Sequence, residues 1–550
     1  MAKSFPGASL EQLIDKLPYI GLDIEGIDDE SEIIRVEFNP NRPDFSSENG
    51  IIRALKGLLE TDTGIPMINN IQESDIFVMV DEGLKDIRQF VVAVIAKRQR
   101  PLTEHETKQL ISMQEDLHNG VGRKRKKSSI GIHDLDSIKF PIFYTTKNKD
   151  FSFKPLNQQK EFTIKEILKD LDIGKEYGYI VKGFPAVPVL IDSNNNVLSF
   201  PPVINGESTR MGPKTNNIFV EVTSTNKRSA EDMLSILSFE LHDMGFQIIK
   251  VNIDLPMEGI IKTPDLKPIV MQIADSYINS VLGLGLTKTD IIKSIEKSRC
   301  SAKIMENGLI ECLVPKYRID IFHPIDICEE VAIGYGINQL SSYLPDVYLF
   351  GKKSRITKTT DNIREILVGL GFIEIINSSI ISKEVLLNYF SNSDMQWEKD
   401  ILYVENTKNS QFDALRSSVV PSMMATLSIN IHEKYPQKLF EIGKIFHVKN
   451  SRIVESLSLG VVIAHNNTDY SEIKSVLQSL TKHCFNKEII TNSVNYSYFL
   501  EGHSAEVIMD EKVIGKIGEI HPYVLENFKL RTPVSAFQIN LDFIINALKL

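Results

Sequence analysis

Helix-like and strand-like segments follow one another irregularly along this chain of 550 residues. Short β-rich runs predict strands at Phe90–Ala96, Tyr179–Val181, Val187–Ile191 and Ile218–Val222, and apolar periodicity predicts a helix from Thr103 to His118. No segment repeats at a fixed period, which argues against a solenoid. This mixture is typical of α+β domains rather than of one doubly wound sheet. At about 150 residues per domain, the chain has room for about four domains.

The overall charge limits what this chain can bind unaided. Its 62 basic and 72 acidic side chains give a net charge of −10, so its mean field repels polyanions and it is not a general binder of phosphate backbones. Any nucleic-acid contact would be local or shared with a partner. The longest purely apolar run, Phe90–Ala96, is far shorter than the roughly 20 residues of a membrane span. Glu11 and Asp15 interrupt the start of the chain, so we expect no secretion signal, no membrane and a cytoplasmic location.

Common catalytic signatures are absent from the sequence. It has no GxxxxGK[ST] phosphate loop, no HExxH zinc helix and no GxSxG nucleophile elbow. Gly283-Leu284-Gly285 begins like a dinucleotide loop, but Lys288 stands where the third glycine is needed. The cysteines form no CxxC pair, so we expect buried small side chains rather than a disulfide scaffold, a zinc site or nucleophiles. They are Cys300, Cys312, Cys328 and Cys484.

Four carboxylates gather around one predicted helix. Pro324 is well placed to begin it, since the missing proline N–H costs nothing there. Asp326, Glu329 and Glu330 are related by spacings of 3 and 4, so they share one face of that helix. Asp320 ends the preceding predicted strand and can reach the same face. Either these acids complement the helix dipole and face solvent, or a cation lies among them, for which an all-oxygen site favours Mg²⁺ over zinc.

Distinctive short motifs are spread over the whole chain. They are, in order, Asn41-Arg42-Pro43-Asp44, Gly131-Ile132-His133-Asp134-Leu135-Asp136, Phe200-Pro201-Pro202-Val203-Ile204-Asn205, Val314–Asn338, Leu415-Arg416-Ser417, Tyr435-Pro436-Gln437, Phe440-Glu441-Ile442-Gly443 and Gly515–Pro522. Together they resemble the β subunit of phenylalanyl-tRNA synthetase, of the shorter archaeal and eukaryotic type. The ordered set is far more specific than any one motif, and the resemblance covers essentially the whole chain.

The resemblance implies a ligase of two α and two β chains that attaches phenylalanine to its tRNA. ATP and the catalytic residues would belong to the α subunit, so we expect no aminoacylation catalyst in this chain. It also implies four domains: an N-terminal α+β domain at 1–75, an editing-like domain at 76–260, a magnesium-binding domain at 263–345, and an antiparallel, class II synthetase-like pseudo-catalytic module at 350–550. The Mg²⁺ site, shared with α, would consist of Asp320, Asp326, Glu329 and Glu330.

The family also hydrolyses tyrosine that is mistakenly attached to the phenylalanine tRNA, and the resemblance implies such an editing pocket in residues 76–260. Two positions depart from archaeal relatives, which commonly have a serine in place of Gly206 and an aspartate in place of Glu221. Losing the hydroxyl and lengthening the acid can shift or weaken editing. A simple turn between strands is the other interpretation of Asn205 and Gly206. The candidate pocket residues are Leu198, Asn205, Gly206, Glu207, Thr209, Glu221 and Thr223.

Three further features each allow two interpretations. Arg416 is either an ATP-clamping arginine or, as we favour for a degenerate copy, a structural residue. The basic run Arg123–Lys127 is either a solvated loop or a phosphate contact to tRNA. Asn41–Asp44 fits a turn before a helix capped by Asp44 or Ser46 better than a direct tRNA or substrate contact. The main alternative function is a free-standing tRNA-binding or trans-editing protein; a generic metal-dependent hydrolase has less support.

Overall fold

The computed structural model describes residues 4–547, apart from residues 6, 8, 29–32, 69–70, 257, 341, 343, 345–346, 348, 391–400, 408 and 410. The chain folds into two compact units, residues 1–344 and residues 345–550. Both units combine helices with largely antiparallel sheets, which confirms the predicted α+β class. None of the described helices has both the length and the apolar character that crossing a membrane requires.

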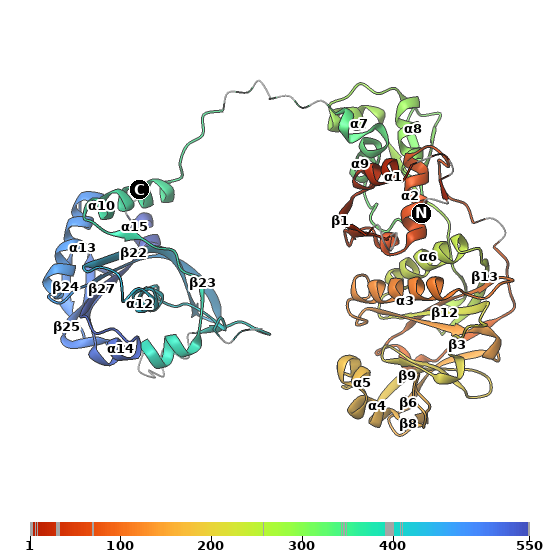
Figure 1. The fold of residues 1–550 in the computed structure, drawn as a ribbon, viewed down its shortest axis with the longest axis horizontal. Coiled ribbons are helices and arrows are strands. Elements are labelled where there is room, and N and C mark those ends of the chain that lie inside the picture. Colours follow the sequence, from red (N-terminus) through yellow and green to blue (C-terminus); the bar gives the residue numbers. More distant parts are fainter. Residues whose placement is uncertain are drawn as a thin grey trace. The chain divides into compact units, whose positions relative to one another are not determined.

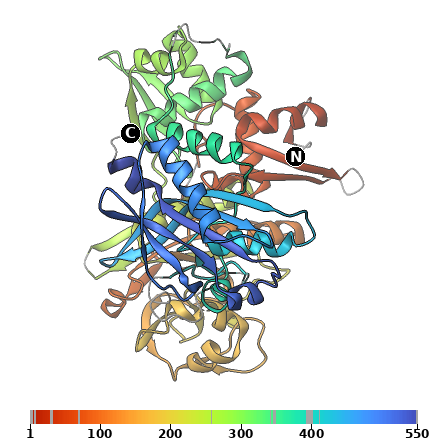
Figure 2. The same ribbon diagram turned by 90° about the vertical axis from the view of Figure 1, so that its left-hand side faces the viewer.

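The first unit opens with two helices and a hairpin: α1 (Leu10–Lys16), β1 (Leu22–Asp28), β2 (Ile33–Phe38) and α2 (Glu48–Leu58). Figure 2 shows the hairpin, in red, extending away from the helices. Ser47 caps α2, because its side chain accepts a hydrogen bond from the N–H of Gly50. The prediction that Asp44 or Ser46 caps this helix is therefore wrong, although Ser46 is the neighbouring residue.

A long sheet forms the middle of the first unit. Its strand order is β11 (Ile204–Asn205), β10 (Val197–Phe200), β9 (Ala186–Ile191), β6 (Ile142–Asn148), β3 (Phe77–Val80), β13 (Gln247–Leu255), β4 (Phe90–Lys97), β12 (Asn217–Ser224) and β5 (Ser128–Asp134), and β14 (Gly259–Thr263) pairs with β13. The helices α3 (Glu104–Asn119) and α6 (Lys227–Asp243) cover the same face of this sheet (Figure 1). Val92 of β4 packs with these helices and Val91 packs on the opposite face, as the two-residue repeat of a strand requires.

The strands predicted within Phe90–Ala96, Val187–Ile191 and Ile218–Val222 are confirmed as β4, β9 and β12, and the predicted helix as α3. The strand predicted at Tyr179–Val181 is wrong, because α5 (Asp172–Tyr177) continues there into a 3₁₀ turn. A three-residue apolar run has no periodicity that separates a strand from a helix end. The neighbouring elements are β7 (Ser152–Phe153), β8 (Phe162–Thr163) and α4 (Ile164–Asp170).

The first unit ends with a small sheet in the order β15 (Ile269–Ile273), β17 (Ile310–Val314) and β16 (Ser301–Ile304), packed on α7 (Asp275–Leu282), α8 (Lys288–Lys297) and α9 (Pro324–Tyr335). Pro324 begins α9 as predicted. Asp320 does not end a strand, because β17 stops at Val314 and a turn follows. Cys300 and Cys312 are buried in this core, and burial raises the pKa of each thiol to about 12, so neither is a reactive nucleophile at neutral pH.

The second unit is built on one sheet with helices on both faces (Figure 1). Val461 faces α10, α13 and α15, whereas Val462 faces α12 and α14. The helices are α10 (Arg355–Gly369), α12 (Val420–Ile429), α13 (Tyr470–Phe485), α14 (Pro522–Asn527) and α15 (Leu541–Ala547). The sheet runs β18 (Ile373–Glu374), β22 (Gln437–Lys449), β23 (Arg452–Ala464), β27 (Val534–Asn540), β26 (Lys512–Ile520), β25 (Phe499–Met509) and β24 (Ile490–Ser493), and a smaller sheet runs β19 (Ile380–Ile381), β21 (Ala414–Leu415) and β20 (Leu402–Tyr403).

Candidate functional site

A cavity of about 760 Å³ opens in the middle of the first unit. Its walls come from α3, α5, β5, β12 and the segment from β10 to Met211, and its size is that of an ordinary small-molecule site. Of the predicted pocket residues, those that line it are Asn205, Gly206, Thr209 and Glu221. The structure therefore brings together side chains that are up to 16 residues apart in sequence.

The other three predicted pocket residues lie outside the cavity wall. Leu198 is fully buried in the apolar core on the opposite side of its strand. Glu207 faces a different hollow, where its Oε2 accepts a hydrogen bond of 2.7 Å from the N–H of Asn157. Thr223 is behind the wall, and its hydroxyl bonds to Arg88 and to Ser129, which does line the cavity.

Glu221 is the most unusual group in this wall. Its side chain is only 2% exposed, and Oε1 accepts a 2.9 Å hydrogen bond from the hydroxyl of Ser199. Oε2 is buried and has no hydrogen-bond partner among the described residues. Gly131 lies directly across the sheet, where any Cβ would collide with Glu221 and with His133. The glycine in the motif Gly131–Asp136 is thus what leaves room for this acid.

His133 lies beside Glu221 and is equally buried. Its Nε2 is 4.0 Å from Oε1 of Glu221 and has no hydrogen-bond partner within the described part of the chain. The other ring nitrogen, Nδ1, is 2.9 Å from the hydroxyl of Thr209, which fixes the ring. Asp134, next in the motif, caps the following turn and accepts a hydrogen bond from Thr215. Of this motif only Ile132 lines the cavity, and the other side chains are buried behind the wall or stabilise the turn that follows.

Gly206 is required by close packing. A Cβ at this position would overlap the carbonyl oxygen of Val197 in the neighbouring strand. The backbone N–H of Gly206 also bonds to the carbonyl oxygen of Leu198, at 2.7 Å. In this chain the backbone thus occupies the space that a serine side chain would need at this position.

The sequence interpretation missed several cavity residues, among them His118, Arg125 and Ser199. Nε2 of His118 accepts a 2.8 Å hydrogen bond from the N–H of Ile130. Burial lowers the pKa of His118, an effect that Glu115 opposes. A signal was present for His118, which lies seven and four residues after Ile111 and Gln114 on the same face of α3.

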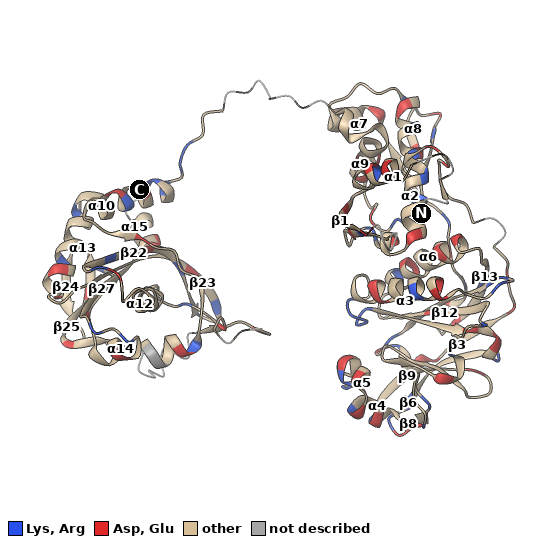
Figure 3. Cartoon of the chain, in the orientation of Figure 1, with Lys and Arg blue, Asp and Glu red and all other residues tan. Residues whose placement is uncertain are grey.

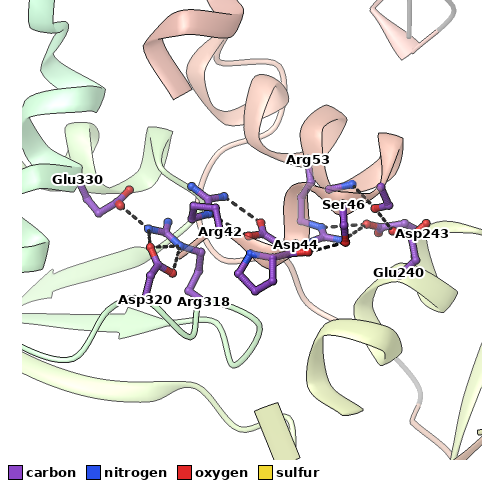
Figure 4. A network of polar contacts seen from close by, with 12 residues as sticks. Arg42, Asp44, Ser46, Arg53, Glu240, Asp243, Arg318, Asp320 and Glu330 are labelled. Carbon is purple, nitrogen blue, oxygen red and sulfur yellow. Dashed lines mark hydrogen bonds and ion pairs between the residues drawn. The ribbon is translucent and has the colours of Figure 1, made fainter. Parts of the chain in front are cut away.

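The acid cluster is organised around a buried arginine (Figure 4). Arg318 is 2% exposed and forms a 2.7 Å ion pair with Asp320 and a short one with Glu330. Asp326 instead caps α9 by accepting hydrogen bonds from the N–H groups of Phe322 and His323. Partial desolvation, with the charges of Glu330 and Asp320, raises the pKa of Glu329. Desolvation opposes ionisation of Asp320, but Arg318 outweighs it and holds the pKa of Asp320 below its usual value.

This arrangement differs from a ready-made Mg²⁺ site. Within the described part of the chain, no group of three or more His, Cys, Asp or Glu side chains is placed to hold a metal ion. A guanidinium already supplies the positive charge next to two of the four predicted ligands, Asp320 and Glu330. As folded here, the four acids do not form a ready-made Mg²⁺ site.

The motif Asn41–Asp44 continues the same network. Arg42 makes two 2.9 Å hydrogen bonds to the carboxylate of Asp44, which is buried. Nearby, Arg53 pairs with Asp243 of α6 (Figure 4). Ser47 donates a 2.5 Å hydrogen bond to Glu240, which is also on α6. These contacts fasten the N-terminal helices to α6 and agree with a structural interpretation of the motif.

Arg416 in the second unit is also held inside the protein. It is 2% exposed, pairs with Glu441 at 2.6 Å and donates a 3.0 Å hydrogen bond to the carbonyl oxygen of Lys444. Gly443 packs against its guanidinium so closely that a Cβ there would collide with it. With its donors directed at the protein, Arg416 is in the position of a structural residue, as favoured from the sequence.

Comparisons with known proteins agree along the whole chain. Residues 340–541 match the model of the phenylalanyl tRNA synthetase beta chain CLM domain, residues 271–337 the tRNA synthetase B5 domain and residues 95–238 the B3/4 domain. The chain is 35% identical to the phenylalanine–tRNA ligase beta subunit of Archaeoglobus fulgidus over 98% of its own length and 96% of the relative's. It is 36% identical to that of Methanocaldococcus jannaschii, over 97% and 96%.

A solved structure agrees with the first unit. An N-terminal fragment of the phenylalanyl-tRNA synthetase beta-subunit from Pyrococcus horikoshii is 35% identical to the chain, with a TM-score of 0.57. The aligned part covers 60% of this chain and 95% of the fragment. The chain belongs to the phenylalanine–tRNA ligase beta-subunit family, and as part of an α/β complex it serves a ligase that forms aminoacyl-tRNA.

Proposed function

We propose that the cavity of the first unit is an editing site that hydrolyses tyrosine from mischarged phenylalanine tRNA. The observation that carries this proposal is the unpartnered Oε2 of Glu221, buried in the cavity wall. A buried carboxylate oxygen without a donor costs about 1–3 kcal/mol, so its retention favours a ligand that brings a donor. The phenolic hydroxyl of tyrosine is such a donor, and phenylalanine lacks it.

The chemistry of the substrates explains why a second pocket is useful. A synthetic site shaped for phenylalanine is apolar, and such a pocket rejects a side chain with one added hydroxyl by only about 100-fold. A separate site that hydrogen-bonds the hydroxyl selects in the opposite direction. Phenylalanine in that site would leave Glu221 unpaired, so correctly charged tRNA would be spared.

The test is the rate at which the intact α/β complex deacylates tyrosyl-tRNA. Glu221→Ala should lower this rate at least tenfold, while the matched variant Glu207→Ala should not, because Glu207 is a carboxylate outside the cavity. Equal rates for Glu221→Ala and the unaltered complex would show that Glu221 takes no part in the hydrolysis. No deacylation by the unaltered complex would remove the editing function itself.

We further propose that the amino acid is activated in the α subunit, in a complex of two α and two β chains that acts in the cytoplasm. The buried ion pair of Arg416 with Glu441 supports this division, since the arginine is not free to clamp ATP. Phenylalanine-dependent ATP–pyrophosphate exchange should appear only when this chain is mixed with α. Exchange by this chain alone would mean that residues 350–550 form a working active site rather than a degenerate class II module.

The proposed domains are those implied by the motifs: 1–75, an editing domain at 76–260, a magnesium-binding domain at 263–345 and the degenerate module at 350–550. A Mg²⁺ ion at Asp320, Asp326, Glu329 and Glu330 would require contacts from α, because Arg318 neutralises two of these acids. Elemental analysis of the α/β complex tests this. Glu329→Gln with Glu330→Gln should lower the Mg²⁺ content, and unchanged content would eliminate the site.

A further inference from the structure

The basic turn between α3 and β5, residues 122–127, has an uncommon backbone conformation. Arg123, Lys124 and Arg125 have φ angles of 50°, 52° and 62°, so three successive residues with side chains are left-handed. Each such residue costs about 1–2 kcal/mol relative to a right-handed one. Gly122 starts the turn where a Cβ would be 2.5 Å from the carbonyl oxygen of Ser128. Such a backbone persists only where surrounding contacts hold it.

Backbone hydrogen bonds hold the turn in place. The N–H of Arg125 donates to the carbonyl oxygen of His118, at 3.2 Å, and the N–H of Lys127 donates to that of Gly122, at 2.8 Å. On the other side, the carbonyl oxygen of Lys127 accepts from the N–H of Thr225, at 3.0 Å. The backbone of the turn is therefore a fixed part of the sheet edge.

Four of the five cations in the turn differ in where they lie. Arg125 points inward and lines the cavity, where it pairs with Glu115 at 2.9 Å, donates to the carbonyl oxygen of Val203 at 3.2 Å and stacks over Tyr177. Three others, Arg123, Lys124 and Lys126, are exposed, and no ion pair joins them to another described residue. In Figure 3 the turn is the blue stretch that follows α3.

We infer that this turn binds backbone phosphates of the single-stranded 3′ end of tRNA and so holds the esterified amino acid at the cavity. The inference rests on the proposed editing function, because it gives the cavity a substrate attached to RNA. Arg125 connects the two parts: consecutive Cα atoms are about 3.8 Å apart, so Lys124 and Lys126 stand beside the residue that lines the cavity. A local group of unpaired cations can bind phosphate even though the chain carries a net charge of −10.

The first test measures the affinity of the α/β complex for uncharged tRNA over a range of salt concentrations. The variant Arg123→Gln/Lys124→Gln/Lys126→Gln keeps the side-chain stems and removes three charges. Three phosphate contacts to a single strand contribute about 2 to the slope of log K against log salt, and the variant should lose that much. The control Lys85→Gln/Lys267→Gln/Lys293→Gln removes three exposed charges elsewhere on the same unit and should keep the slope. A variant slope equal to the control's would overturn the inference.

Shortened tRNA identifies which phosphates are bound. With tRNA that lacks its last three nucleotides, the unaltered complex should show the reduced slope, and the variant should show no further reduction. If the two changes reduce the slope additively, the turn binds another part of the tRNA and the 3′-end assignment is wrong.

Hydrolysis separates this inference from the editing proposal. The triple variant should raise KM for tyrosyl-tRNA at least tenfold and leave kcat unchanged, and it should hydrolyse 3′-tyrosyl-adenosine, which has no phosphodiester, as the control does. If the unaltered complex hydrolyses neither substrate, the editing proposal fails and the salt slopes still decide the role of the turn. If the variant matches the control on both substrates, the inference about the turn fails alone.

Discussion

Nε2 of His133 lies 4.0 Å from Oε1 of Glu221, and both side chains are almost completely buried. Neither Nε2 of His133 nor Oε2 of Glu221 has a hydrogen-bond partner among the described residues. Both atoms belong to one small polar group under the cavity, together with Ser199 and Thr209. Because buried polar atoms are nearly always paired in folded proteins, this group is incomplete without a ligand.

An incomplete polar group should be less stable than a completed one. Glu221→Gln supplies an N–H that can donate to Nε2 of His133. We therefore expect this variant to raise the free energy of unfolding of the complex by about 1 kcal/mol, measured by thermal melts. Glu207→Gln alters a carboxylate that faces a different hollow, so it should change the free energy of unfolding by less. A clear loss of stability in Glu221→Gln would show that Oε2 of Glu221 has a partner within the folded chain.

Gly206→Ala tests the close approach of two strand ends. The added methyl group would meet the carbonyl oxygen of Val197, so we expect a loss of about 1–3 kcal/mol of unfolding free energy. Gly183→Ala is the matched control, because nothing lies within 4 Å of a Cβ there. Equal stabilities of the two variants in thermal melts would contradict the packing at Gly206.

Arg318→Met tests the charge balance of the acid cluster. Removing the guanidinium leaves the carboxylates of Asp320 and Glu330 unpaired in a buried place, which should destabilise the protein by about 3–5 kcal/mol. Arg228→Met removes an exposed arginine and should cost less than about 1 kcal/mol. The double variant Arg318→Met/Glu330→Met should recover part of the loss. If Glu330→Met worsens it instead, Glu330 is stabilised by something other than Arg318.

His118 should make strand β5 sensitive to acid. Burial lowers its pKa below the ordinary value of 6.5, so the folded protein binds fewer protons than the unfolded chain does. The stability that neutral His118 contributes is thus present above about pH 6.5 and is lost as the pH falls through the lowered folded value. Amide exchange at Ile130, corrected for its intrinsic pH dependence, should accelerate between pH 7 and pH 5. His118→Gln keeps an acceptor for Ile130 without titrating, and persistence of the acceleration in that variant would refute this account.

Local patterns predicted much of this fold because they act over a few residues. Thr103 caps α3 and Pro324 begins α9, and both signals can be read from neighbouring residues. The motif Gly131–Asp136 was recognised as a unit, but only the strand pairing shows that Gly131 makes room for Glu221. Spacing on α9 likewise grouped its acids, while the pairing of Arg318 with Glu330 depends on how the turn packs against that helix.

The sequence predicted only part of the candidate site, because the rest depends on tertiary packing. Asn205, Gly206, Thr209 and Glu221 line the cavity, but Leu198 alternates to the other side of its strand. Thr223 is on the same face of β12 as Glu221, yet it lies behind the cavity wall, where it bonds to Arg88 and Ser129. The inward turn of Arg125 could not be read from the sequence, because a run of five cations gives no sign of left-handed backbone. Such features are set by tertiary packing, which short-range patterns do not contain.

The most direct test of the account measures how tightly the α/β complex binds two analogues whose amino acid is joined to 3′-amino-3′-deoxyadenosine by a stable amide. Calorimetry should show that the tyrosyl analogue binds about 10- to 100-fold more tightly than the phenylalanyl analogue. This ratio of dissociation constants corresponds to the free energy of one hydrogen bond to a charged group. In Glu221→Ala this preference should disappear, and in Glu207→Ala it should remain. Equal affinities for the two analogues in the unaltered complex would contradict the central claim that Glu221 selects tyrosine by its hydroxyl.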